Sequence, residues 1–194
     1  MNYATIKYCD IANGIGVRTS LFVSGCTHAC PGCFNEVAWN FHYGNTFDEE
    51  EQQAIIDSLA PDYIAGLSVL GGEPMEPANQ RALAPFLKRV KRVYPKKTIW
   101  VYTGDIFEDL IDPQSPRHTE ATSDLLSSID VLVDGPFIQE LKDITLRFRG
   151  SQNQRLLDVP ASLKAGRGCP WEDDPLFAQH SMGRQDTRPL SQRS

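Results

Sequence analysis

Four short apolar runs, each closed by a glycine, constrain the fold of this chain most strongly. Their β-branched and aromatic residues are apolar on both faces, as in strands buried on both sides of a parallel sheet. The intervals between them are long enough for a helix and a return to the next parallel strand. The runs are residues 19–25, 67–72, 98–104 and 130–135. The pattern predicts an α/β fold, either a partial (β/α) barrel or an open, mostly parallel sheet.

The intervals between these runs carry helical patterns. Residues 48–59 place apolar side chains at helical spacing behind an acidic first turn, which suits the helix dipole. Residues 77–93 repeat apolar positions at intervals of three and four, and Pro85 within them is expected to kink the helix or to move its start. A third helix is expected within residues 110–129, after a loop that contains Pro113 and Pro116.

The chain has 194 residues, which suits one domain and is too short for a complete eight-stranded barrel of about 250 residues. From residue 160 onward the composition becomes polar and rich in proline. We therefore expect a catalytic domain over residues 1–159 and a polar, flexible C-terminal tail over residues 160–194.

Charge and hydropathy exclude several classes of function. With 19 basic and 25 acidic residues the net charge is -6, which argues against general nucleic-acid binding. The apolar runs are far shorter than the roughly 20 residues of a membrane span, and the first residues lack the apolar core of a signal peptide. The expected compartment is the cytoplasm.

Three of the five cysteines, Cys26, Cys30 and Cys33, crowd into one short segment. In a reducing compartment this spacing indicates a metal or redox site rather than a disulfide framework. A helix presenting three buried thiols is one alternative, but Pro31 and Gly32 would break it. In a loop, the same spacing lets three thiolates converge on one point.

The number of available ligands bears on which metal the three cysteines bind. Structural zinc sites usually take four protein ligands. The candidates for a fourth, none convincingly spaced, are Cys9, His28, His42 and Cys169. Three cysteines fit a 4Fe-4S cluster better, because one iron would then lack a protein thiolate and could bind a substrate.

The C-x3-C-x2-C loop after the first predicted strand resembles the signature of the radical S-adenosylmethionine superfamily. The resemblance implies that the open iron binds the methionine part of S-adenosylmethionine, and that a reduced cluster cleaves this cofactor to begin hydrogen abstraction. It assigns Cys26, Cys30 and Cys33 to the cluster and to catalysis. Gly32 stands where an aromatic residue is common in the superfamily, and Phe34 is expected to pack against adenine instead.

A second motif, Gly71-Gly72-Glu73-Pro74, ends the second predicted strand. Taken alone, it is explained by a tight turn before a helix. Beside the cysteines it resembles the superfamily's GGEP motif, in which backbone carbonyls and the glutamate bind the methionine ammonium. Glycines allow a close approach of the backbone, and the acceptors face a cation. The expected cofactor contacts are Gly32, Cys33, Phe34, Gly71, Gly72 and Glu73.

Further motifs indicate a branch of the superfamily. The runs DIANGIGVR, LFVSGCTHACPGCFN, VLVDGPF and RFRGSQNQR occur in this order, and across about residues 1–157 they resemble the activating proteins of the anaerobic ribonucleoside-triphosphate reductase. The resemblance implies that a glycine of the reductase is the substrate and becomes a glycyl radical. The alternatives are an activase of another glycyl-radical enzyme such as pyruvate formate-lyase, a zinc-stabilised module or an electron-transfer iron-sulfur module.

Several polar residues near the predicted strand ends are weaker candidates. Asp134 suits either a ribose hydroxyl or a turn-forming Asp-Gly pair. Two roles are open for Arg147, Arg149 and Asn153: contact with the cofactor or the partner, or the usual role of surface residues beside a final strand. His28 is expected to be a loop residue rather than a ligand, because three thiolates are already available.

One basic run interrupts this acidic chain. It suits a solvated helix end favoured by the dipole, or a docking surface for an acidic electron donor such as reduced flavodoxin. Its members are Lys88, Arg89, Lys91, Arg92, Lys96 and Lys97.

Overall fold

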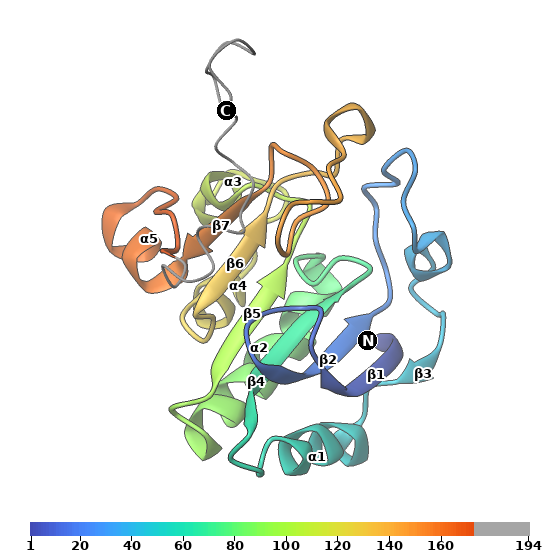
Figure 1. Cartoon of the computed structure of the whole chain (residues 1–194), viewed down its shortest axis with the longest axis vertical. Helices are drawn as coiled ribbons and strands as arrows, with labels where there is room; N and C mark the ends of the chain where they lie inside the picture. Colours follow the sequence, from blue (N-terminus) through green and yellow to red (C-terminus); the bar gives the residue numbers. More distant parts are fainter. Residues whose placement is uncertain (173–194) are drawn as a thin grey trace, which may run out of the picture.

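The computed structural model describes residues 1–172, and within them the strands form one seven-stranded sheet in the order β3-β1-β2-β4-β5-β6-β7 (Figure 1). The strands are β1 (Asn2–Asp10), β2 (Val17–Val23), β3 (Asn45–Thr46), β4 (Ile64–Gly71), β5 (Thr98–Tyr102), β6 (Val131–Asp134) and β7 (Arg155–Asp158). The central four, β2, β4, β5 and β6, pair in parallel. In antiparallel pairs, β1 joins β2, β3 joins β1 and β7 joins β6. The edge strands β3 and β7 do not pair, so the sheet is open and mixed rather than a closed barrel.

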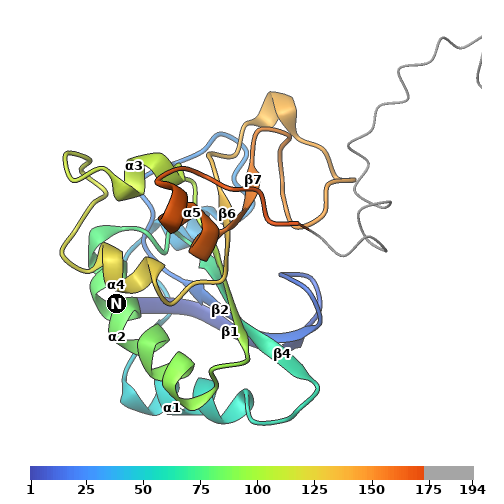
Figure 2. The same ribbon diagram turned by 90° about the vertical axis from the view of Figure 1, so that its left-hand side faces the viewer.

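The helices follow the strands as the α/β pattern predicts. They are α1 (Glu49–Ser58), α2 (Pro77–Val93), α3 (Phe107–Ile111), α4 (Thr122–Leu126) and α5 (Val159–Ala165), with 3-10 helices η1 (Glu36–Trp39) and η2 (Gln139–Leu141). Figure 2 shows α1, α2 and α4 on one side of the sheet. None of the helices among residues 1–172 has the length and hydropathy needed to cross a membrane.

Helix α2 differs from the prediction at its internal proline. Helix α2 continues through Pro85, which lies on its exposed face, where water can reach the carbonyl that loses its donor. Pro77 stands at the start of α2, where its missing N–H is not needed. The helix expected after the loop with Pro113 and Pro116 is confirmed as α4, and a further short helix, α3, precedes that loop.

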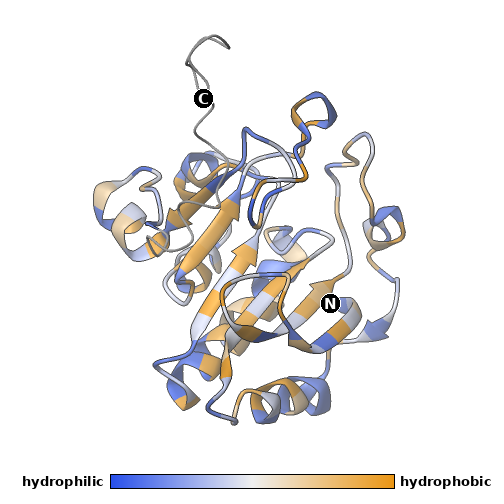
Figure 3. Cartoon of the chain, in the orientation of Figure 1, coloured by the Kyte–Doolittle hydropathy of each residue, from blue (hydrophilic) through white to orange (hydrophobic). Residues whose placement is uncertain are grey.

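The strands alternate between two environments, and Figure 3 shows how strongly apolar they are. Toward the helices, side chains such as Leu67, Val69 and Ile99 belong to the main core. The opposite face carries a smaller cluster built around Trp100. Burial on both faces is the reason why these strands show continuous apolar runs.

The second face also buries a charged side chain. Arg18 is fully buried, and its guanidinium donates five hydrogen bonds, all to neutral oxygens. The acceptors are the Ser68 and Thr98 hydroxyls and the carbonyls of Ile15, Leu67 and Thr98. Burial lowers the pKa of Arg18 to about 10, so the side chain stays cationic at neutral pH.

The chain continues to pack beyond the predicted boundary at residue 159. Helix α5 begins there, and the Trp171 amide then donates to the carbonyl of Leu156 (2.9 Å). The Trp171 ring lies edge-on to Trp100 at 5.1 Å between centroids. The remainder of the predicted tail, residues 173–194, lies outside the described residues, and its flexibility stays a prediction.

Candidate active site

The candidate site lies at the carboxyl ends of the parallel strands, where loops after β2, β4 and β5 meet. The loop after β2 contacts the turn after β4 through the backbone: the Glu73 amide donates to the carbonyl of Gly25, and the Gly72 amide to that of Val23, both at 2.8 Å. Ligands of open α/β sheets bind at this edge, because loops converge there. The fold therefore brings two segments far apart in the sequence into one place.

A cavity of about 530 Å³ opens at this edge. All eight predicted site residues line it: Cys26, Cys30, Gly32, Cys33, Phe34, Gly71, Gly72 and Glu73. Cys9 and Cys169 do not belong to this lining. The three clustered cysteines are partly buried and free, and all three line this one cavity.

The cysteine loop is closed at its base and irregular beyond it. The amides of Gly25 and Cys26 donate to the carbonyls of Ala38 (2.8 Å) and Trp39 (3.2 Å). Residues 26–33 form no helix, which contradicts the alternative of three thiols on one helix face. Gly32 has φ +73°, a left-handed conformation that favours glycine and turns the chain before Cys33.

The turn after β4 is packed so closely that its second glycine has no room for a side chain. A Cβ at Gly72 would lie 2.7 Å from the carbonyl oxygen of Gly25 and 3.0 Å from that of Ala38. Gly71 has φ +112°, which again favours glycine. The need for glycine here is thus set by the backbone of the cysteine loop.

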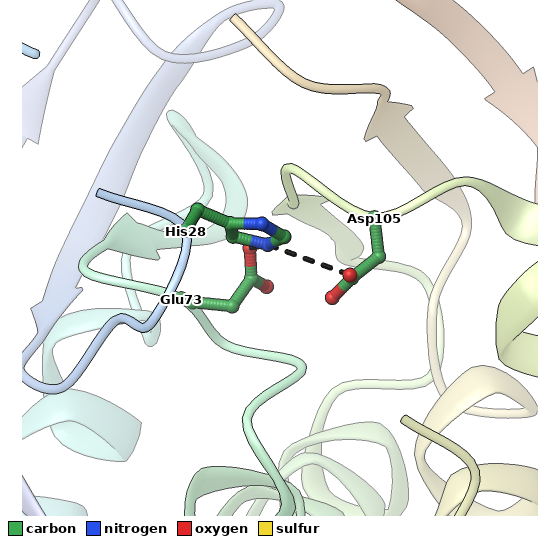
Figure 4. A group of neighbouring side chains, drawn as sticks. All are labelled: His28, Glu73 and Asp105. Atoms are coloured by element: carbon green, nitrogen blue, oxygen red, sulfur yellow. Dashed lines mark hydrogen bonds and ion pairs between the residues drawn. The ribbon is translucent and has the colours of Figure 1, made fainter. Parts of the chain in front are cut away.

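Glu73 is almost fully buried, and its carboxylate is held on several sides. It accepts from the amides of Met75 (2.7 Å) and Gly104 (2.8 Å), and His28 Nε2 lies 3.1 Å from its Oε2. Asp105 Oδ1 lies 3.4 Å from the same imidazole nitrogen, and Figure 4 shows both carboxylates beside the ring. Hydrogen bonds to Asp105 and Glu73 raise the pKa of His28 to about 10.

His28, Glu73 and Asp105 lie close enough together to bind a metal ion. The imidazole, once protonated, already supplies a cation between the two carboxylates. This contact favours the prediction that His28 is a loop residue rather than a cluster ligand.

The chemistry of the cavity fits a metal cluster with an organic cofactor. Burial raises the pKa of Cys26 to about 11, so its thiolate needs a cation to stabilise it, as a bound metal would. The buried Tyr102 hydroxyl, also in the lining, has no hydrogen-bond partner among the described residues. An unsatisfied buried hydroxyl in a cavity wall is expected to meet a polar group of a ligand.

Four residues near the site were not predicted from the sequence: Thr27, Glu76, Asp105 and Arg117. The Arg117 guanidinium lies 2.7 Å from Glu76 Oε2 and 3.1 Å from Asp105 Oδ1, and it donates to the Thr27 hydroxyl (3.0 Å). Asp105 lies three residues after the end of β5, and its place near the carboxyl end of a predicted strand could have indicated it. Arg117 belongs to an irregular loop, where no periodicity or spacing marks it.

The weaker candidate residues differ in what they contact. Asp134 is fully buried, and its carboxylate accepts from Arg155 and from the Phe107 amide, so a structural ion pair is favoured over a ribose contact. Arg149 lines the cavity, whereas Arg147 packs over the Phe148 ring. The Asn153 amide group donates to the carbonyl of Pro136.

The basic run lies at the far end of α2, near the amino ends of the strands and away from the cysteines (Figure 1). Four of its six side chains have partners in the chain: Lys88 with Asp124, Arg89 with Glu49, Lys91 with Asp130, and Lys97 with backbone carbonyls. The interpretation as a helix end is therefore favoured over a docking surface.

Comparison with known proteins adds an independent line of evidence. Residues 12–157 match a family described as a 4Fe-4S single cluster domain. The anaerobic ribonucleoside-triphosphate reductase-activating protein of Haemophilus influenzae is 46% identical over 156 residues, covering 79% of this chain and 96% of that protein. Proteins of the same name are 40% identical in Escherichia coli K12, covering 79% and 96%, and 38% identical in Enterobacteria phage T4, covering 80% and 93%.

Proposed function

The chain belongs to the family of anaerobic ribonucleoside-triphosphate reductase-activating proteins, and from this premise we propose that it activates such a reductase by generating a glycyl radical on it. The observation that carries the proposal is the cavity at the carboxyl edge of the sheet, which unites the three clustered cysteines with the Gly71–Gly72–Glu73 turn. The open sheet, with four parallel strands and its large helices on one side, supports a partial barrel of the radical S-adenosylmethionine type.

Cys26, Cys30 and Cys33 would hold a 4Fe-4S cluster and leave one iron without a protein ligand. When bound, this cluster supplies one electron for the cleavage of S-adenosylmethionine to methionine and 5′-deoxyadenosine, whose new hydrogen atom comes from a glycine of the reductase. The residues of the chain bind and orient the reactants for this reaction.

The turn after β4 would hold the ammonium of S-adenosylmethionine through its backbone carbonyls and the Glu73 carboxylate. The amides of Met75 and Gly104 fix that carboxylate before any ligand arrives, so little reorganisation is needed. The backbone of Gly32 and Cys33 and the side chain of Phe34 would contact the adenosyl part. Phe34 supports this role because it lines the cavity and its surface is 90% exposed, ready to be covered.

Electrons would come from a carrier such as reduced flavodoxin, and the carrier is expected to approach the cysteine edge rather than the distant basic run. We propose the cytoplasm as the compartment, because all five cysteines are free and the cluster needs reducing conditions.

The test is anaerobic reconstitution followed by reaction with the reductase. We expect about four irons and sulfides per chain, as a 4Fe-4S cluster requires, and a change in the EPR spectrum of the reduced cluster on adding S-adenosylmethionine. Adding the reductase should then give 5′-deoxyadenosine and the EPR doublet of a glycyl radical, and Cys30→Ala should abolish both. Stoichiometric zinc without iron would contradict the proposal. Radical formation only on pyruvate formate-lyase would instead identify an activase of that enzyme.

A further inference from the structure

The segment between Cys26 and Cys30 is held by side chains rather than by a strand or helix. The Thr27 amide and hydroxyl both donate to Glu76 Oε1, at 2.8 and 2.6 Å. Beside it, the His28 imidazole contacts Glu73 and Asp105. Three carboxylates therefore fasten a loop that has no regular secondary structure of its own.

Buried carboxylates so close together need a cation, and Arg117 supplies it. Its side chain is 15% exposed and contacts Glu76, Asp105 and the Thr27 hydroxyl at the same time. Burial alone would raise the pKa of Glu76, but hydrogen bonds from Arg117 and Thr27 outweigh it and lower that pKa. The planar guanidinium can serve several acceptors in fixed directions, which a lysine cannot do.

The loop that carries Arg117 is itself anchored. The fully buried Gln80 side chain donates to the carbonyls of Arg117 and Met75, both at 2.7 Å, and accepts from the hydroxyls of Thr119 and Thr122. The first turn of α2 therefore fixes the Arg117 backbone relative to the end of β4. A rigid connection runs from α2 through Arg117 to the cysteine loop.

We propose that Arg117 is a positioning residue for the metal-binding loop: acting through Glu76, Asp105 and Thr27, it holds the segment between the first two cysteines in the geometry that binds the cluster. The inference rests on the proposed function, since it takes Cys26 and Cys30 as cluster ligands. Groups that orient metal ligands without touching the metal commonly affect metal affinity about 10- to 100-fold.

The first experiment needs no metal. In the metal-free chain, Arg117→Gln should make the Thr27 amide exchange with solvent deuterium about tenfold faster, because the Glu76 acceptor loses its fixed position. Amides in the centre of β4 should exchange as in the unchanged chain. Arg81→Gln is the matched control, since it breaks an exposed ion pair with Glu120 in the same loop (2.7 Å) and should leave the Thr27 amide unaffected.

The second experiment uses the reconstituted chain. Arg117→Gln and Arg117→Lys should both lose iron to a chelator about tenfold faster than the unchanged chain and should alter the EPR spectrum of the reduced cluster. Thr27→Val should act like Arg117→Gln, because it removes the hydroxyl that joins Glu76 to Arg117. Thr27→Ser keeps that hydroxyl and should restore slow iron loss.

The outcomes separate the two proposals. Equal Thr27 exchange in Arg117→Gln and Arg81→Gln overturns the positioning role, whatever metal the chain binds. Faster exchange throughout β4 also overturns it, because Arg117 would then support the whole fold. If the unchanged chain binds no iron, the proposed function fails, and with it the link from Arg117 to a cluster, even where the loop exchange behaves as expected.

Discussion

Arg18 and Arg117 are both largely buried arginines, yet they are surrounded by different chemistry. Arg18 lies near the amino ends of the strands, where hydroxyl and carbonyl oxygens of β4, β5 and a neighbouring loop accept all five of its hydrogen bonds. Arg117 lies at the carboxyl edge among side chains from three other segments, two of them carboxylates. One arginine joins strands to each other, and the other joins the loops at the carboxyl edge to one another.

From this difference we expect Arg18 to contribute mainly to the stability of the fold and Arg117 mainly to the geometry of the site. Removing Arg18 strips donors from oxygens of the sheet itself, so the loss should appear in the free energy of unfolding. Removing Arg117 frees loops that the sheet does not need, so the loss should appear in local order at the cysteines. Three substitutions test this division, and a fourth, at a partly exposed ion pair elsewhere, provides a reference for comparison; they follow in order of decreasing effect.

Arg18→Met should have the largest effect, lowering the free energy of unfolding by about 3 kcal/mol, because buried acceptors lose charged donors and no water can replace them. Arg18→Lys keeps the charge without the guanidinium fork, so it should also destabilise the chain. Urea denaturation of the metal-free protein measures both. A loss near zero for Arg18→Met would mean that the arginine is dispensable to the sheet.

Gly104→Ala should disturb the carboxyl edge without changing any charge. The new Cβ would lie 2.9 Å from the His28 ring, which must move. We expect a loss of about 1–2 kcal/mol from overpacking and faster amide exchange within residues 26–33. In a His28→Ala background, Gly104→Ala should change the free energy of unfolding very little. If the loss is as large there as in the unchanged chain, the contact with His28 is not its cause.

Ser68→Ala tests the Arg18 site more gently. The Ser68 hydroxyl accepts from Arg18 Nε (2.7 Å) and donates to the carbonyl of Asn13. Losing this hydroxyl should lower the free energy of unfolding, measured by urea denaturation, by about 1 kcal/mol. In the Arg18→Met background the decrease should be smaller, because both changes remove the same hydrogen bond. Full additivity in the double variant would argue against this coupling.

Glu108→Gln should have the smallest effect, below about 1 kcal/mol, because this carboxylate is 40% exposed and its attraction to Arg155 is screened. Arg155 lowers the pKa of Glu108 from 4.5 to about 2. A lowered pKa in the folded state stabilises the fold above pH 4.5, and this contribution is lost as the pH falls toward 2. The stability difference from the unchanged chain should therefore shrink over that range, and a constant difference would exclude the ion pair as its source.

The central strands could be predicted because burial on both faces leaves continuous apolar runs, and their parallel order is confirmed. Strands β1 and β7 were missed for the opposite reason. β1 is half exposed along most of its length, and β7 has charged residues at both ends and fully buries only Leu157, so neither shows a continuous apolar run.

The candidate site likewise contains residues that could be predicted from the sequence and residues that could not. Cysteine spacing and the double glycine are local features of the sequence, so eight residues of the cavity lining could be named in advance, and the family with its 4Fe-4S domain is confirmed. The contacts of Arg117 with Glu76 and Thr27 join single residues separated by long stretches of chain. Only tertiary structure brings such residues together, and no local pattern announces them.

The backbone hydrogen bonds at the base of the cysteine loop affect what happens to the fold when the metal is lost. Because Gly25 pairs with Ala38 and Cys26 with Trp39, the two ends of this segment are joined to each other without any metal. Loss of a bound metal would then disturb the loop rather than the sheet and its core. We expect the chain to remain folded after it has lost its cluster in air. The same chain should then bind a new cluster under anaerobic conditions, without new protein being made.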